Sequence, residues 1–192
     1  ADVGFAFDGD ADRLVVVDEN GNPIHGDKLL GKIATFLKSQ NALTNNGACV
    51  TVMSNQALED YLAKDGIKTY RCDVGDKNVL EALYKEKINF GGEQSGHIIL
   101  SDFTKTGDAL VAALCVMHCV LIEKKKVSKL LNPFELYPQL QQNITVDNKI
   151  PLTEIKGYPA LVKEIESKKI RVLIRYSGTE NLLRILLEGK EE

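Results

Sequence analysis

Three aspartates at alternate positions, Asp8, Asp10 and Asp12, follow directly after the apolar segment 3–7 and precede Arg13. A tight turn at the end of a strand can aim all three carboxylates at one point. Crowded carboxylates repel one another and raise one another's pKa unless a counter-charge is present. Oxygen ligands of this kind suit a hard cation such as Mg²⁺ or Ca²⁺. The spacing therefore predicts a divalent-cation site with Asp8, Asp10 and Asp12 as its ligands.

Other interpretations of this acidic loop fit the sequence less well. In an EF-hand, the three aspartates would fill the first, third and fifth positions and Glu19 the twelfth, but the sixth position requires glycine and is Arg13. In phosphatases with an aspartate nucleophile, Asp8 would attack phosphorus, and the third aspartate and Arg13 fit that pattern poorly. An acidic turn that binds nothing is the remaining alternative.

A second polar loop lies between two strand-like stretches and reads Gly-Gly-Glu-Gln-Ser-Gly-His over residues 91–97. Its glycines allow the backbone to come close to a ligand, while Glu93 and Ser95 supply the acceptor and the donor that sugar hydroxyls require. His97 closes the loop. An ordinary glycine-rich turn is the alternative, because motifs of this length are common.

A third polar loop, residues 175–181, reads Arg-Tyr-Ser-Gly-Thr-Glu-Asn between two apolar strands. An arginine fork, two hydroxyls and backbone amides next to a glycine can converge on a phosphate group. A polar turn with solvated arginines explains the same residues. Arg184, however, interrupts the apolar strand that follows, which favours a position facing a site.

Composition limits the classes of function. With 192 residues, 44% hydrophobic and 27% charged, the chain is long enough for a globular, soluble protein. The net charge is −3 and basic residues are scattered, so neither nucleic acid nor a membrane surface is an expected partner. The cysteines have no CxxC spacing and no secretory segment is evident, which predicts reduced thiols in a cytoplasmic protein. The apolar stretch 109–122 is too short to cross a bilayer and predicts a buried helix.

The elements that position the three loops fall into segments 1–42, 43–132 and 133–192. The first contains strands around an acidic loop and one amphipathic helix, and is only part of a domain. In the second, strands alternate with helices, which predicts an α/β domain of three layers with a mixed, largely parallel sheet. The third predicts a small α+β domain. The lysine-rich stretch 124–129, followed by Asn132-Pro133, predicts a hinge.

Hydrophobic periodicity gives the expected elements. The predicted strands are residues 3–7, 14–17, 49–53, 67–73, 89–91, 97–100, 144–146, 170–174 and 182–187. The predicted helices are residues 27–38, 57–64, 78–87 and 158–167, with a long helix from Asp108 onward.

The three loops in this order, DGDADR, GGEQSGH and RYSGTENLLR, resemble the α-D-phosphohexomutase family, and in particular its branch that acts on glucosamine phosphates. The resemblance covers essentially the whole chain, including Val74-Gly75-Asp76-Lys77 and the helix start at Thr106-Gly107-Asp108. It implies that residues 1–42 end the family's second domain, residues 43–132 form the sugar-binding third domain, and residues 133–192 form a slightly truncated, phosphate-binding fourth domain.

The resemblance also implies roles for individual residues. Asp8, Asp10 and Asp12 would hold a Mg²⁺ ion that also contacts a phosphorylated serine, and Arg13 would help to neutralise that phosphate. The sugar hydroxyls would be recognised by Glu93 and Ser95, with His97 supporting the same loop. The phosphate that is not transferred would be held by Arg175, Ser177, Gly178, Thr179 and Arg184.

The implied activity is the interconversion of glucosamine 6-phosphate and glucosamine 1-phosphate through a phosphoserine enzyme and a bisphosphate, for amino-sugar nucleotide and peptidoglycan precursor synthesis. The family's serine lies in a Ser-His-Asn-Pro-like loop of an N-terminal domain, and this sequence has no such loop. We therefore expect part of a larger enzyme, inactive without its N-terminal domains, with a homodimer left open. The alternatives are the phosphomannomutase/phosphoglucomutase branch and a non-catalytic module that binds phosphosugars or divalent cations.

Overall fold

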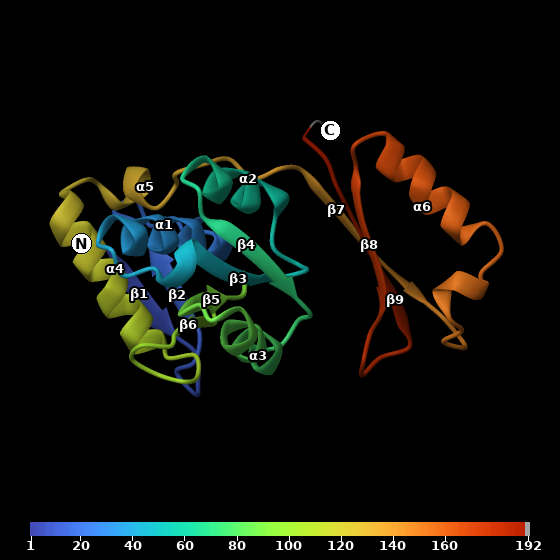
Figure 1. The fold of residues 1–192 in the computed structure, drawn as a ribbon, viewed down its shortest axis with the longest axis horizontal. Coiled ribbons are helices and arrows are strands. Elements are labelled where there is room, and N and C mark those ends of the chain that lie inside the picture. Colours follow the sequence, from blue (N-terminus) through green and yellow to red (C-terminus); the bar gives the residue numbers. More distant parts are fainter. Residues whose placement is uncertain (191–192) are drawn as a thin grey trace. The chain divides into compact units, whose positions relative to one another are not determined.

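The computed structural model describes residues 1–190 and divides into two units, residues 1–135 and the part of the chain from Leu136 onward. The strands of the first unit are β1 (Gly4–Phe7), β2 (Leu14–Val17), β3 (Gly47–Thr51), β4 (Lys68–Cys72), β5 (Phe90–Gly92) and β6 (Ile98–Leu100). Its helices are α1 (Gly26–Ser39), the 3₁₀ turn η1 (Thr44–Asn46), α2 (Gln56–Lys64), α3 (Asp76–Glu86), α4 (Ala109–Glu123) and α5 (Val127–Leu130) (Figure 1). The second unit contains β7 (Gln139–Thr145), the 3₁₀ turn η2 (Leu152–Glu154), α6 (Tyr158–Ser167), β8 (Arg171–Tyr176) and β9 (Leu182–Glu188).

In the first unit, β3 lies inside a four-stranded sheet with the order β4-β3-β5-β6. It pairs in parallel with β4 and β5, whereas β5 and β6 are antiparallel. All of its residues are buried, as expected for a strand that is covered on both faces. The sheet is therefore mixed, and the predicted α/β fold class is confirmed.

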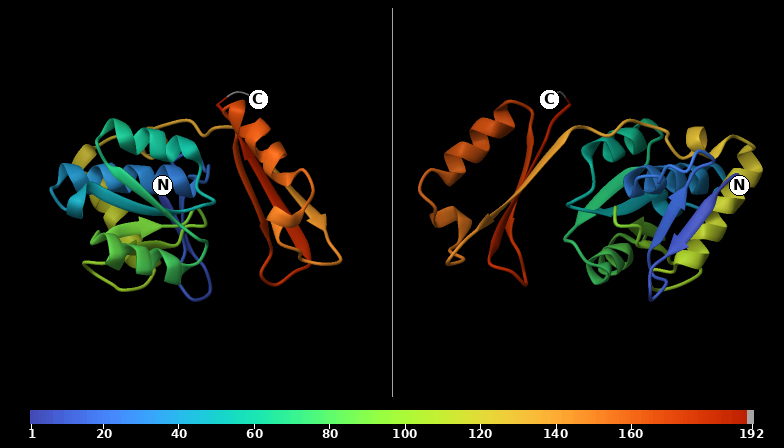
Figure 2. Two further views of the ribbon diagram at one scale, coloured as in Figure 1. Left: turned by 45° about the vertical axis from the view of Figure 1, so that its right-hand side comes forward. Right: turned by 180° about the vertical axis from the view of Figure 1, so that it is seen from behind.

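Helices cover both faces of this sheet (Figures 1 and 2). Successive side chains of a strand point to opposite faces. Ala48 and Val50 of β3 join the hydrophobic cluster that includes α1 and α2. Cys49, between them, joins a smaller cluster with Val79 and Leu83 of α3. The first unit therefore has three layers, with α3 on the opposite face from α1 and α2.

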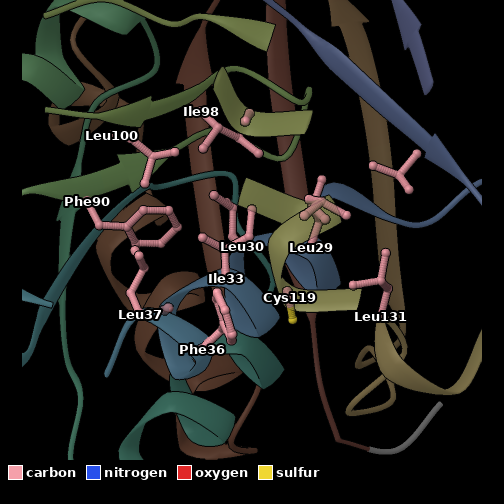
Figure 3. Packing of buried hydrophobic residues seen from close by; sticks show 14 of the residues in the cluster. Leu29, Leu30, Ile33, Phe36, Leu37, Phe90, Ile98, Leu100, Cys119 and Leu131 are labelled. Atoms are coloured by element: carbon pink, nitrogen blue, oxygen red, sulfur yellow. The ribbon is translucent and has the colours of Figure 1, made fainter. Parts of the chain in front are cut away.

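The main core is built on one face of α1. This face consists of Leu29, Leu30, Ile33, Phe36 and Leu37. The spacing of these residues is helical and each is at most 8% exposed. Figure 3 shows them near β5, β6 and α4, whose core residues include Phe90, Ile98, Leu100 and Cys119. Burial of each large side chain contributes roughly 1.5–3 kcal/mol, so α1 is held firmly against the strands that flank the second polar loop.

The same arrangement of elements occurs twice in the first unit. The antiparallel pairs β1–β2 and β5–β6 are followed by α1 and α4, respectively. The turn of the first pair contains the acidic loop, and the turn of the second contains the Gly-rich loop. Both helices start at a Gly-Asp dipeptide, Gly26-Asp27 and Gly107-Asp108. Two of the three predicted site loops thus occupy equivalent positions in two similar units.

The prediction that residues 109–122 form a buried helix is only half right. α4 buries one face through small residues such as Ala112 and Ala113. On the other face, Leu114 and Leu121 are 62% and 64% exposed. An apolar sequence cannot show which of its faces lacks a partner, so periodicity alone overestimated the burial. Within residues 1–190, no helix is both long and apolar enough to span a bilayer.

The lysine-rich part of the predicted hinge, residues 124–129, is packed into the first unit and is not a linker. This stretch includes α5, whose Val127 and Leu130 are 2% and 3% exposed and belong to the main core. Ser128 also donates both its backbone amide and its hydroxyl to the Glu19 carboxylate. The lysines gave this stretch the composition of a linker. Val127 and Leu130 nevertheless pack into the main core and hold it there. The division between the units falls later, after Glu135.

In the second unit, β9 lies between β7 and β8, and both pairings are antiparallel. Cross-strand pairing places Arg175 of β8 opposite Arg184 of β9, with Asn143 of β7 on the other side of Arg184. Paired residues point to the same face, so the centre of this face is polar. With α6 packed beside β8, the predicted small α+β domain is confirmed.

Candidate functional site

The acidic loop is a tight turn between β1 and β2. Ala11 adopts the left-handed conformation with φ 56°, and its amide donates to the Asp8 carbonyl at 3.1 Å. This conformation costs a non-glycine residue on the order of 1–3 kcal/mol and persists where the surroundings enforce it. One ligand atom from each of Asp8, Asp10 and Asp12 lies within 4.8 Å of the others. The predicted convergence of the three carboxylates is therefore present.

Three hydrogen bonds donated by backbone amides fix the acidic loop: one lies within the loop and two join it to other segments. The amide of Ala109, at the start of α4, donates to the Ala11 carbonyl at 3.0 Å. The Arg13 amide donates to Asp8 Oδ1 at 3.1 Å. The Leu14 amide donates to the Gly96 carbonyl at 3.0 Å. These contacts hold the strained turn in place, so the carboxylates are arranged before any cation binds.

Arg13 supplies the counter-charge of the loop. Its Nε lies 3.7 Å from Asp8 and 3.9 Å from Asp12, and its side chain is 56% exposed. Desolvation is the largest single influence and raises the pKa of Asp8. The hydrogen bonds from the Arg13 amide and from Asp12, together with the attraction of Arg13, outweigh it, so the pKa is lowered. Carboxylates were expected to raise one another's pKa only where no counter-charge is present, and the hydrogen bonds to Asp8 and the charge of Arg13 lower the pKa here.

The donor set fits a hard divalent cation. Oδ1 of Asp12 is buried and has no hydrogen-bond partner among the described residues. A buried carboxylate oxygen without a partner is costly, and a cation bound between the three aspartates would satisfy it. Both Mg²⁺ and Ca²⁺ prefer such oxygen ligands, and Mg²⁺ keeps several waters when few carboxylates hold it.

The second polar loop is a turn that requires glycine at one position. Gly96 has φ 94°, and a Cβ atom there would lie 2.3 Å from the Leu14 carbonyl oxygen. The Gly96 amide donates to the Glu93 carbonyl at 3.1 Å, and the Glu93 amide donates to the His97 carbonyl at 2.8 Å. Ser95 is exposed at the tip. The turn thus presents Ser95 to solvent while its base lies against β2.

His97 connects the two loops. Its side chain is 3% exposed, and Nδ1 lies 3.1 Å from Oδ2 of Asp12. The ring packs against Gly107, where a Cβ atom would come within 2.2 Å of it. The sequence interpretation gave His97 a supporting role within its own loop. The structure adds that it also orients Asp12, 85 residues away in the chain.

Sequence reasoning missed several residues that position the second loop. Glu93 Oε1 accepts a hydrogen bond from the Gly75 amide at 3.0 Å, just before α3. Gly26, at the start of α1, leaves room for the Gln94 carbonyl, which a Cβ atom would approach to 2.1 Å. The next residue, Asp27, is fully buried and accepts from the Asn55 amide at 2.8 Å. Glycine before a helix was the available signal, but only the fold shows what the glycine faces.

The third loop joins β8 to β9 in the second unit. Ser177 is 4% exposed, its amide donates to the Leu182 carbonyl at 2.8 Å, and its Oγ accepts from the Glu180 amide at 3.3 Å. Gly178 and Thr179 are exposed at the tip, and no atom lies within 4 Å of the space that a Cβ of Gly178 would fill. The buried Ser177 therefore shapes the turn, and the tip is open to a ligand.

Charged side chains surround the base of the third loop. Arg175 and Arg184 face each other across β8 and β9. Lys149, which sequence reasoning missed, donates from Nζ to the Ser177 carbonyl at 2.7 Å. Three cations near one turn favour an anionic ligand. The structure therefore brings the first two predicted loops together in one unit and assembles the third within the other.

Two family models match the chain. The model for "Phosphoglucomutase/phosphomannomutase, alpha/beta/alpha domain III" covers residues 25–137. The model for "Phosphoglucomutase/phosphomannomutase, C-terminal domain" covers residues 142–192. The first of these alone matches more than half of the chain.

Similar proteins carry related names. The chain is 58% identical over its whole length to proteins named phosphoglucosamine mutase from Nautilia profundicola and Helicobacter acinonychis, and covers 44% and 43% of them. It thus spans less than half the length of these relatives. The crystal structure of Aspergillus fumigatus N-acetylphosphoglucosamine mutase, in complex with GlcNAc-6P and magnesium, has a similar fold: TM-score 0.78 at 20% identity, covering 97% of this chain and 45% of that one. The chain therefore belongs to the phosphoglucomutase/phosphomannomutase family, the α-D-phosphohexomutases.

Proposed function

We propose that this chain supplies the metal-binding and substrate-binding parts of a phosphoglucosamine mutase that interconverts glucosamine 6-phosphate and glucosamine 1-phosphate. The observation that carries the proposal is the joining of the acidic loop to the Gly-rich loop, through the contact between His97 and Asp12 and the hydrogen bond from Leu14 to Gly96. A carboxylate cluster fixed beside a loop with sugar-binding groups is what phosphoryl transfer to a sugar requires. Relatives 55–59% identical to the chain bear the same enzyme name.

The acidic loop would hold Mg²⁺ through Asp8, Asp10 and Asp12. A bound Mg²⁺ neutralises charge that develops on a transferring phosphoryl group and polarises its oxygens. Arg13, exposed next to the carboxylates, would add positive charge toward the same phosphate. His97 would keep Asp12 in the orientation that the ion requires. These residues contribute positioning and charge neutralisation, which is most of what enzymes contribute to this reaction.

The other two loops would bind the substrate. Glu93 and Ser95 would contact sugar hydroxyls, with His97 supporting their loop. The distal phosphate would be held by Arg175, Ser177, Gly178, Thr179 and Arg184. Of these, Ser177 would act by shaping the turn, since it is buried. Peptidoglycan precursor synthesis in the cytoplasm is the setting that this substrate implies.

Further proposals concern the whole enzyme. Residues 1–42, 43–132 and 133–192 would correspond to the end of domain 2, domain 3 and domain 4 of the family. The phosphorylated serine would come from an N-terminal domain, because this sequence has no Ser-His-Asn-Pro-like loop. Residues 1–192 alone should therefore show no mutase turnover, and measurable turnover by the purified chain would contradict this.

The test is an assay of the full-length enzyme with glucosamine 6-phosphate. Chelation by EDTA should abolish turnover, and Mg²⁺ should restore it. Asp10→Asn should lower kcat at least about 100-fold, since a metal supplies several kcal/mol of transition-state stabilisation. The matched control is Asp65→Asn, the same substitution at an exposed position outside the three loops. Good turnover of mannose 6-phosphate with none of glucosamine 6-phosphate would overturn the substrate assignment.

A further inference from the structure

Two arginines in the second unit form an incomplete anion site. Arg175 and Arg184 occupy directly opposed positions of β8 and β9, where like charges are destabilising. Within residues 1–190, no ion-pair partner of the Arg175 guanidinium is found. The Nε of Arg184 is buried and has no hydrogen-bond partner in this part of the chain. Arg175 therefore has donors for an anion, and Arg184 has a buried donor that no other group satisfies.

One carboxylate already occupies part of this site. Glu180 Oε2 accepts a hydrogen bond from Arg184 Nη2 at 2.7 Å, and the Ser177 hydroxyl lies 3.5 Å from the same oxygen. Arg184 is one of the groups assigned above to contact the substrate phosphate, and Ser177 shapes the same turn. Glu180 therefore contacts Nη2 of Arg184, a donor that a phosphate oxygen would also contact, and leaves Nε of Arg184 without a partner.

We propose that the Glu180 carboxylate is a built-in competitor of the substrate phosphate. In the free enzyme it takes one position of the phosphate clamp, and it moves into solvent when a phosphate binds. Its side chain is 55% exposed, so it can leave without losing buried contacts. A phosphate ester carries about −1.5 to −2 charges and three acceptor oxygens, enough to bridge Arg175 and the Nη2 of Arg184 that Glu180 vacates.

The proposed competition suits a mutase, and to that extent this inference rests on the proposed function. An enzyme with a bisphosphate intermediate must release the distal phosphate and bind the other one in the same clamp. A clamp whose arginines are already partly neutralised holds each phosphate less tightly. Glu180 would thus position Arg184 and, by competing for it, limit the affinity of the clamp for phosphate.

The test titrates inorganic phosphate and glucosamine 6-phosphate into the whole chain at low salt, with NMR of the third loop as the readout. An exposed ion pair is worth little, so Glu180→Gln should tighten binding by about 1.5-fold to fivefold. Glu180→Asp keeps the charge but shortens the arm, so it should also bind phosphate more tightly than wild type. The matched control is Glu164→Gln, which removes another exposed ion pair, with Lys168, and should leave binding unchanged.

The outcomes separate this inference from the proposed function. If wild type binds phosphate but Glu180→Gln binds it equally or more weakly, the competitor role is wrong and the phosphate clamp stands. If Glu180→Gln binds more tightly and Glu180→Asp does not, the effect is one of net charge and the competitor role is also wrong. If wild type binds no phosphate, or if Arg184→Ala binds it as tightly as wild type does, the assignment of the third loop itself fails. A residue that only stabilised the turn would weaken binding when replaced.

Discussion

Asp27 shows how much one buried charge depends on its neighbours. Its side chain is fully buried in the first turn of α1, beside the Gly-rich loop. Desolvation by burial raises its pKa, and the hydrogen bond from the Asn55 amide and the proximity of His25 offset this only in part. The folded state therefore favours the protonated carboxyl more than the unfolded chain does.

This raised pKa predicts a pH-dependent stability. A group whose folded pKa lies above its unfolded value stabilises the fold at low pH, and this contribution is lost as pH rises through the folded pKa. The free energy of unfolding of wild type relative to Asp27→Asn should therefore fall as the pH rises from about 3.9, the ordinary pKa of an aspartate, through the raised pKa of Asp27 in the folded state. Urea unfolding of both proteins at each pH measures this difference.

The control for that experiment is Asp65→Asn, which removes a carboxylate from an exposed position. A difference between wild type and Asp27→Asn that stays constant over the pH range would show that Asp27 does not titrate differently in the folded state.

Contacts between site residues could be predicted where the residues are close together in the sequence. The convergence of Asp8, Asp10 and Asp12 follows from alternation after a strand. The contact of His97 with Asp12 depends on two turns meeting in space, which local patterns do not encode. The burial of Asp27 could not be predicted either, because an aspartate in the first turn of a helix is usually explained by its favourable interaction with the helix dipole.

At the scale of elements, a helix start acts as a support for a loop. Gly26, the first residue of α1, packs against the Gln94 carbonyl. Gly107, just before α4, packs against the ring of His97. The starts of two helices therefore pack against the same Gly-rich turn. The core face of α1, described above, prevents this helix from moving away.

Gly26→Ala should therefore be costly. Its new Cβ would come 2.1 Å from a backbone oxygen, so either α1 or the Gly-rich loop must shift. Overpacking of this kind costs about 1–3 kcal/mol, and we expect that loss in chemical denaturation, together with weaker binding of glucosamine 6-phosphate.

Gly178→Ala provides the comparison, because its Cβ would meet no atom within 4 Å. It should change stability by no more than about 0.5 kcal/mol. Equal losses for the two variants would mean that Gly26 is not a close-packed position.

Most elements could be predicted from periodicity, and the errors have physical causes. α6 has the bounds that its pattern predicted, Tyr158–Ser167. β7 begins at Gln139, five residues before the predicted start, because its first residues are mostly polar and the strand is an edge of the sheet. α5 was missed because it is a single turn that follows three lysines, and its burial depends on contacts with distant parts of the chain.

At the scale of the whole molecule, the two units differ in burial. Every residue of β3 is buried in the first unit, whereas every residue of β8 in the second is only partly buried. None of the residues of α6 is buried. A small unit that buries little apolar surface gains little stability from its core.

The second unit should therefore open more readily than the first. In native-state hydrogen exchange, amides of β8 and β9 should exchange at least about tenfold faster than those of β3, because local opening costs less where fewer contacts are lost. Equal protection in both units, or loss of protection in both at the same denaturant concentration, would contradict this.

The repeated strand–turn–strand–helix unit has an evolutionary consequence. One copy carries the proposed metal ligands and the other carries the proposed sugar-binding loop. The two turns are joined by the contact of His97 with Asp12 and by the hydrogen bond from Leu14 to Gly96. Neither contact uses a side chain of Glu93, Gln94 or Ser95. Under the proposed function, substitutions at these positions should therefore alter which sugar is accepted and leave the proposed metal ligands in place. Under the proposed function, a repeated unit of this kind would let sugar preference change while the residues that serve phosphoryl transfer stay the same.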